Sequence, residues 1–294
     1  MRRDRVDTNR VAKLALSLVF MCAGAVTAAQ EPLSQDEVLR QIYSNYDAKT
    51  KTAQWVCTEG QKRKIGTQEG WWCNAQDLAV TVELLQMSLV WEGNAAKTYA
   101  VASAKPPKDY DCHSCEPAVG VGVFVWKDLR WVLESANPAV GFYGEFGSPP
   151  SVDLINAGPD KYGVILSTGF GGQGYYSSRK ALILPCGSTA SEVWSIDDEE
   201  DNYGAYDPSG ENGPKVRYRS WAALRFTPSE DERGQFREFY DLEVSSRGLD
   251  RRGPKASLRS ENWTETYRFS DGKYKLISHK DFLEVEKPNS KPTK

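Results

Sequence analysis

Apolar and polar residues alternate along most of this chain from Trp71 onward, and this alternation constrains the fold more than any other feature. A two-residue period places successive side chains on opposite faces of an extended backbone, so each run predicts a half-buried β-strand. Short turns separate most runs, and no helical pattern comes between them. The sequence therefore predicts a mainly β fold, an antiparallel meander, sandwich or barrel-like sheet. The expected strands are residues 78–91, 118–126, 130–135, 162–168, 180–184, 216–226, 239–246, 264–270 and 273–278.

Three of the connections between these strands are predicted to be tight hairpin turns. Asp271-Gly272 supplies the two residue types that accept positive φ in a type I′ turn, and residues 125–131 (VWKDLRW) predict a second hairpin. Residues 169–174 (GFGGQG) match the G-x-G-x-x-G spacing of a dinucleotide-binding loop. That site needs a helix after the glycines, whereas the following residues continue as strand. A glycine-rich hairpin turn is predicted there instead.

One amphipathic helix is predicted near the N-terminus. Ser34 and Glu37 have the spacing of a capping box, in which each side chain binds a free N–H group of the first helical turn. The apolar residues that follow at helical spacing are Val38, Leu39, Ile42, Tyr43 and Tyr46.

The first 29 residues have the pattern of a secretory signal: a basic start, an apolar run, and small residues up to Ala29. We therefore expect a periplasmic or secreted protein of 265 residues without a transmembrane helix. The signal carries five basic and two acidic residues, so its removal changes the net charge from −3 to −6. This acidic balance argues against a nucleic-acid partner. The expected regions are 1–29 (signal), 30–104 (helix plus strands), 105–285 (β-rich) and 286–294 (disordered tail).

Five cysteines remain after cleavage, and an oxidising compartment predicts disulfides among them. Cys57 and Cys73 enclose a polar loop of 15 residues, whose closure would stabilise the fold by about 3 kcal/mol. Cys112 and Cys115 form a C-x-x-C motif, but a strand is predicted after it rather than the helix that activates a redox thiol. One such motif also supplies only two of the four ligands of a structural zinc site. A disulfide role is favoured for this pair, and the role of Cys186 stays open.

An acidic run at residues 197–207 is predicted to be a solvated loop. Asp197, Glu199, Asp201 and Asp207 are candidate calcium ligands, although their spacing does not fit an EF-hand. The same loop is a candidate docking surface for a basic partner. The candidate binding residues are Trp71, Trp72, Asp197, Asp198, Asp201 and Tyr203.

No catalytic motif is supported by its sequence context. Ser177 and Lys180 match S-x-x-K, the motif of penicillin-recognising enzymes, but they lie in an expected strand and lack the partner motifs. We therefore expect a non-enzymatic binding protein of inhibitor or immunity type that recognises another exported protein and needs no cofactor. Two alternatives stay open: a glycan or peptidoglycan hydrolase with a carboxylate pair, and a thiol–disulfide protein that uses Cys112 and Cys115.

The segments DCHSC, VGVGVFVW, GFGGQGYY, DNYGAYD and YRFSDGKYKL together resemble a group of uncharacterised exported β-rich proteins of proteobacteria. Such proteins often carry a CHxC entry to a strand and a later N-x-G-A-C element. The resemblance covers residues 105–280 and implies a β fold without a known activity. This chain has Tyr206 where the resemblance implies a cysteine, which would leave Cys186 without its partner.

Overall fold

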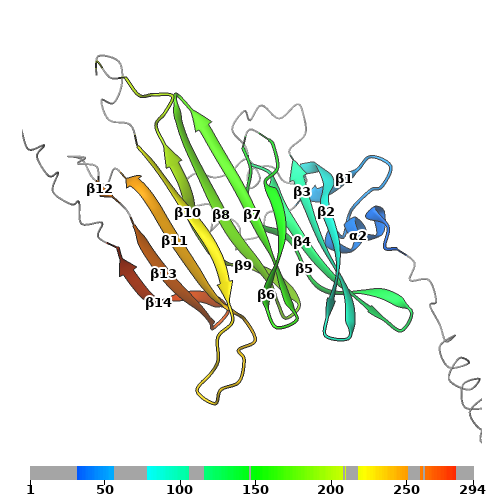
Figure 1. The fold of residues 1–294 in the computed structure, drawn as a ribbon. Helices are drawn as coiled ribbons and strands as arrows, with labels where there is room; N and C mark the ends of the chain where they lie inside the picture. The colour runs from blue at the N-terminus through cyan, green and yellow to red at the C-terminus, as the bar shows by residue number, and fades with distance from the viewer. Residues whose placement is uncertain are drawn as a thin grey trace, which may run out of the picture. The chain divides into compact units, whose positions relative to one another are not determined.

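The computed structural model describes residues 32–55, 78–105, 116–145, 147–207, 209, 218–250, 259–260 and 262–282. The chain divides into two units, Met1–Leu33 and Ser34–Lys294, and every element below belongs to the second. Within this unit the strands form two sheets of five and nine strands, with antiparallel pairing throughout (Figure 1). The predicted mainly β, antiparallel fold is confirmed.

The five-stranded sheet has the order β1-β2-β3-β4-β5, so each strand pairs with its neighbour in sequence. Its strands are β1 (Thr52–Trp55), β2 (Leu78–Glu92), β3 (Ala95–Lys105), β4 (Ala118–Lys127) and β5 (Arg130–Phe142). Asp128 and Leu129 both have positive φ between β4 and β5, which confirms the hairpin predicted there. β3 and β4 flank the boundary expected near residue 105 and pair with each other. The change of sheet falls instead between Phe142 and Ser151.

The predicted helix is α2 (Gln35–Ile42), and it begins with the expected capping box at Ser34 and Glu37. It ends earlier than its apolar pattern, because Tyr43 already has an extended conformation. The helix packs on β4, where a Cβ added to Gly122 would lie 2.8 Å from Ile42. Alternation gives β4 a face of small residues toward the helix and a face of valines on the other side.

The nine-stranded sheet has the order β14-β13-β11-β10-β9-β8-β7-β6, with the short β12 paired to β11. Its strands are β6 (Ser151–Gly158), β7 (Lys161–Gly172), β8 (Tyr175–Cys186), β9 (Thr189–Asp201), β10 (Arg219–Thr227), β11 (Asp241–Asp250), β12 (Arg259–Ser260), β13 (Trp263–Ser270) and β14 (Lys273–Asp281). Gln173-Gly174 and Asp271-Gly272 have positive φ at both residues, so both predicted hairpin turns are confirmed.

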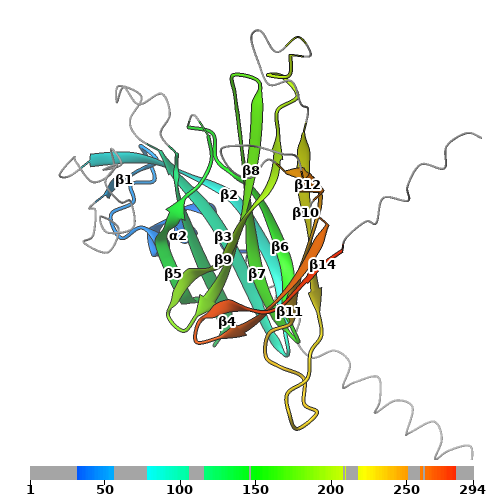
Figure 2. The ribbon, with the colours of Figure 1, turned by 90° about the vertical axis from the view of Figure 1, so that its left-hand side faces the viewer.

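The nine-stranded sheet curves, so that β14 at its end contacts β9 near its middle (Figure 2). Aromatic and aliphatic side chains fill the inside of this curve. The buried members of this cluster are Ala157, Ile165, Leu182, Leu184, Val193, Trp194, Leu242, Val244 and Tyr274.

A second core lies between the two sheets. Its buried members are Tyr99, Val101, Val119, Val121, Val123, Val140, Tyr143, Val164, Leu166, Ala181, Ile183 and Ala190. β7 and β8 contribute alternating side chains to both cores. Both faces of these strands are therefore covered at residues 164–166 of β7 and 181–184 of β8. In the described ranges, no helix has the length and apolar character needed to cross a membrane.

Candidate functional site

The candidate site lies at one end of the nine-stranded sheet, where the two-sided packing stops. This distal end comprises the Gln173-Gly174 turn, the adjoining ends of β7, β8, β9 and β10, and residues 202–207. The backbone N–H of Ala205 donates to the carbonyl of Gly174 over 2.8 Å, so the two segments are tied together. A Cβ at residue 174 would lie 2.2 Å from the Ala205 nitrogen, so only glycine allows this contact.

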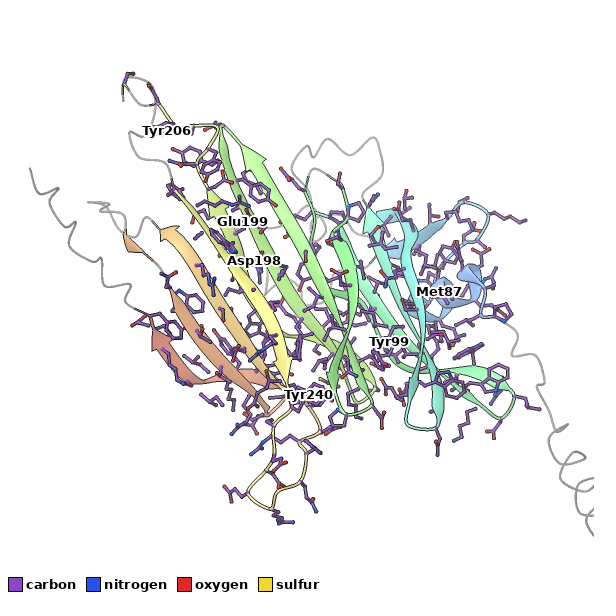
Figure 3. The ribbon with its side chains drawn as sticks, in the orientation of Figure 1. Met87, Tyr99, Asp198, Glu199, Tyr206 and Tyr240 are labelled. Atoms are coloured by element: carbon purple, nitrogen blue, oxygen red, sulfur yellow. The ribbon has the colours of Figure 1, made fainter. Side chains whose placement is uncertain are left out.

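The first part of the acidic run, residues 197–201, is not a loop, which corrects the expectation from sequence, whereas residues 202–207 lie outside the strands. Residues 197–201 are the last part of β9 and pair with β8. Figure 3 shows Tyr206, Glu199 and Asp198 in this order from the tip along the sheet. A register shift opposite Ser178 and Arg179 inserts Asp198 as an extra residue in β9. This β-bulge changes which acidic side chains share a face.

Two of the acidic side chains are held by ion pairs. The buried carboxylate of Asp198 accepts a 2.7 Å hydrogen bond from the Ser178 hydroxyl and lies 2.7 Å from Nζ of Lys180. Glu199 accepts hydrogen bonds of 2.9 and 2.6 Å from the guanidinium of Arg219. These bonds explain how acidic residues, which are rare in strands, are accommodated at the end of β9.

The candidate calcium ligands do not form one cluster in the part of the chain that the structure describes, where no group of three or more His, Cys, Asp or Glu side chains could hold a metal ion. Glu199 is bound to Arg219, and Asp207 accepts a 2.9 Å hydrogen bond from the backbone of Ser209. Calcium binding stays a prediction.

Large aromatic side chains are exposed around the distal end, and we call this set the aromatic end. Their exposed fractions lie between 37% and 53%. The set comprises Phe170, Tyr175, Tyr176, Tyr203, Tyr206 and Trp221. Of these, only Tyr203 was a candidate binding residue from sequence. The guanidinium of Arg219 lies 5.8 Å from the ring centre of Trp221, in cation–π range, so the arginine is fixed between an aromatic ring and Glu199.

A cavity of about 300 Å³ lies beside the aromatic end, and we call it the acidic cavity. Its charged lining residues are Glu116, Glu145, Asp197 and Arg179, and Phe170 and Ser177 contribute to its wall. A second cavity of about 390 Å³ shares Glu145 with it and continues along residues 148–151. The two together form a groove between β7 and the connection from β5 to β6.

Hydrogen bonds fix the polar side chains of this groove. The backbone N–H of Gly171 donates to the Glu145 carboxylate over 3.2 Å. Nη2 of Arg179 donates to the Ser195 hydroxyl over 2.9 Å and lies 3.5 Å from the carboxylate of Glu192. Glu192 also accepts a hydrogen bond from the hydroxyl of buried Tyr143. The guanidinium of Arg179 is therefore held by Ser195 and Glu192, and the carboxylate of Glu192 opposes its charge.

Glu116, one of the lining residues of the cavity, has a perturbed carboxyl group. Neighbouring atoms remove water from it and raise its pKa, while the charge of Arg179 acts in the opposite direction. The residue is nevertheless exposed overall, so solvent reaches it and the loss of water is partial. A raised carboxyl pKa in a cavity is a feature of functional sites as well as of ion-pair networks.

The S-x-x-K motif is confirmed to lie on a strand. Ser177 and Lys180 are three residues apart in β8, so their side chains point to opposite faces. Lys180 binds Asp198, whereas Ser177 borders the acidic cavity. They form no catalytic pair.

Several sequence-predicted residues lie outside the described residues: Trp71, Trp72, Cys57, Cys73, Cys112 and Cys115. The strand predicted after the C-x-x-C motif is present as β4. Within the described residues Cys186 has no disulfide, and burial raises the pKa of its thiol, which disfavours a reactive thiolate.

The position of Cys186 corrects one implication of the resemblance. Cys186 ends β8, whereas residue 206 lies near the Gly174 turn where β8 begins. The length of β8 separates them by roughly 35 Å at about 3.3 Å per residue. A cysteine at position 206 could not bridge Cys186, because a disulfide joins Cα atoms within about 7 Å.

Comparisons with protein-family models, curated proteins and solved structures found no match to this chain. Any functional conclusion for this chain therefore rests on the geometry of the distal end. Sequence reasoning did not identify Glu116, Glu145, Phe170 or Arg179 as site residues. These four residues share no sequence motif. The one sequence feature that marked this region is the glycine-rich run with aromatic residues around Phe170.

Proposed function

We propose that this chain is an exported, non-enzymatic binding protein of inhibitor or immunity type that recognises another exported protein through its aromatic end and acidic cavity. The observation that carries the proposal is the exposure of six large aromatic side chains at one end of the nine-stranded sheet. Aromatic side chains are enriched among the residues that dominate protein–protein binding energy.

The anchoring of the surrounding side chains also supports a binding role. Arg219 is bound to Glu199 and lies against Trp221, and Arg179 is bound to Ser195. Side chains that are already fixed lose less conformational freedom when a partner binds. The distal end is therefore preorganised for recognition.

The charge of the chain indicates the chemistry of the partner. The expected mature protein has a net charge of −6, and the described lining of the acidic cavity has three carboxylates and one guanidinium. Complementary charge accelerates association and rejects partners of the same sign. A partner with a basic contact surface fits this arrangement.

Site-specific photo-crosslinking of the full chain in its producing cells tests the proposal. We expect a crosslinker at Tyr176 to yield one discrete protein adduct. The matched control is a crosslinker at Phe236, which is 66% exposed on the loop after β10, at the opposite end of that strand. No adduct from the distal position, or the same adducts from both positions, would contradict the proposal.

Substitutions then measure the energetic role of the aromatic end. With the captured partner purified, Trp221→Ala is expected to weaken binding by about tenfold or more, as for a hot-spot aromatic residue. Phe236→Ala is expected to change the affinity less than about twofold, because most exposed residues outside an interface core contribute little. Equal effects of both substitutions would place the interface elsewhere.

One observation favours a second candidate function, hydrolysis of a glycan or peptidoglycan. The raised pKa of Glu116, which lines the cavity together with Glu145 and Asp197, is suited to a general acid that works with a second carboxyl group. Turnover of purified peptidoglycan that Glu116→Gln abolishes would support the hydrolase. Intact peptidoglycan after prolonged incubation would exclude it.

A further inference from the structure

The residues around the acidic cavity lie on one face of three neighbouring strands. Phe170 pairs with Ser177, Thr168 pairs with Arg179, and Arg179 pairs with Asp197. Directly paired residues share a face of a sheet, so these side chains converge on the same space. Glu116 and Glu145 approach that space from the five-stranded side.

The charges of the described residues that line this space sum to a negative value. Three carboxylates line it, those of Glu116, Glu145 and Asp197. Among the described lining residues the one guanidinium is that of Arg179, which is directed toward Ser195 and Glu192, and Glu192 opposes its charge. A cation that entered the cavity would therefore meet an excess of negative charge.

Size and shape limit the cation that fits. A volume of about 300 Å³ is at the lower end of the range for small-molecule sites, which extends to about 1,000 Å³. Phe170, 53% exposed, forms part of the wall, and an aromatic ring attracts a cation to its face. A long, flexible chain that ends in a positive charge matches these features.

We propose that the acidic cavity receives a lysine or arginine side chain of the partner protein, as the basic anchor of the interface. This inference rests on the proposed function and names the partner residue that the distal end selects. Trp221 and the other exposed aromatic residues would contact the surface around that anchor.

Short capped peptides test the cavity without knowledge of the partner. The probes are Ala-Arg-Ala and Ala-Lys-Ala, with Ala-citrulline-Ala as the matched uncharged probe, titrated into the purified mature chain at low salt and followed by NMR chemical shifts. We expect the two basic peptides to bind at the cavity and to weaken as salt is added. We expect the citrulline peptide not to bind.

Variants of the chain locate the site. Asp197→Asn and Glu145→Gln are each expected to weaken basic-peptide binding about two- to fivefold, the effect of a partly exposed ion pair. Asp128→Asn is the control, because it removes the same charge from an exposed turn and asparagine accepts the positive φ there. Thermal unfolding of each variant verifies that it is folded.

The outcomes separate this inference from the proposed function. Equal binding of the citrulline peptide, or unchanged binding by both cavity variants, would overturn the inference. A captured partner that binds both cavity variants with full affinity would also overturn it and leave the proposed function in place. Basic-peptide binding without any captured protein would support the cavity and contradict the proposed function.

Discussion

The contact between helix α2 and strand β4 leads to a specific prediction about stability. Gly120 and Tyr43 meet at this contact, where a Cβ on residue 120 would lie 2.4 Å from the tyrosine hydroxyl oxygen and 3.0 Å from the carbonyl oxygen of Pro138. Ordinary contacts of this kind are 3.4–4 Å. Gly120→Ala therefore forces the tyrosine ring to move by about 1 Å in a close-packed interior.

The expected magnitude follows from two opposing effects. Overpacking a well-packed core costs about 1–3 kcal/mol. Replacing glycine by alanine at a negative φ stabilises the fold by about 0.4–1 kcal/mol, because it lowers the conformational entropy of the unfolded chain. The difference of these values spans about 0–2.6 kcal/mol, and we expect Gly120→Ala to lower the free energy of unfolding by about 1–2 kcal/mol, around the middle of that range.

Tyr43→Phe provides the test of the mechanism. The Tyr43 hydroxyl is buried and has no hydrogen-bond partner among the described residues, and burial raises its pKa. Its removal is expected to be neutral or to stabilise the fold by up to about 1 kcal/mol. Because it also removes the atom that a methyl group at residue 120 would strike, the double variant should recover about 1 kcal/mol relative to the sum of the single effects.

Urea unfolding of the purified mature chain and its three variants measures this cycle. Gly171→Ala is the control, since a Cβ there would have its nearest contact at 3.9 Å. Effects of the two single substitutions that add within about 0.5 kcal/mol would refute the reasoning. They would show that the hydroxyl does not limit the space at residue 120.

Two further predictions concern charged side chains. Lys97→Met is expected to destabilise the fold by about 3 kcal/mol, because it leaves the buried side chain of Glu92 without the ammonium group 2.8 Å away. Lys275→Met removes a lysine from an exposed ion pair and should change the free energy of unfolding by less than about 0.5 kcal/mol. Similar urea midpoints for the two variants would contradict this prediction. The His279 ring nitrogens lie 2.9 and 3.0 Å from two carboxylate oxygens, of which Glu265 contributes the larger effect in raising the histidine pKa above 6.5. The stabilisation is full below the unfolded pKa and is lost as pH rises through the raised folded pKa, so the melting temperature of wild type should exceed that of His279→Gln at pH 5.5 and the gap should shrink toward pH 9. A gap that does not change with pH would show that the charge of His279 has no role.

The capping box and the tight turns could be predicted from the sequence, because each depends on a few neighbouring residues. Ser34 and Glu37 satisfy N–H groups of their own helical turn, and Asp271-Gly272 adopts positive φ within one hairpin. The two-residue period likewise needs only an extended backbone. These local rules were enough for the fold class.

The sequence analysis did not predict β1, β3, β6, β9 or β12. Two of these strands have segments of weak β propensity. β3 (Ala95–Lys105) is rich in alanine, and the end of β9 is a run of acidic residues, both poor strand formers. Their neighbours make them strands: β3 is buried between β2 and β4, and β9 is paired with β8 and stabilised by Lys180 and Arg219.

The sequence by itself determined the fold class, the helix and its first turn, and the positions of the tight turns, because backbone preferences and side-chain period act over a few residues. Only the tertiary structure decided how the acidic run is divided. The bulge at Asp198 directs this residue to Lys180, while Asp197 lines the cavity with Arg179. Register and strand pairing depend on residues far apart in the chain, so no local pattern shows which side chains meet at the distal end.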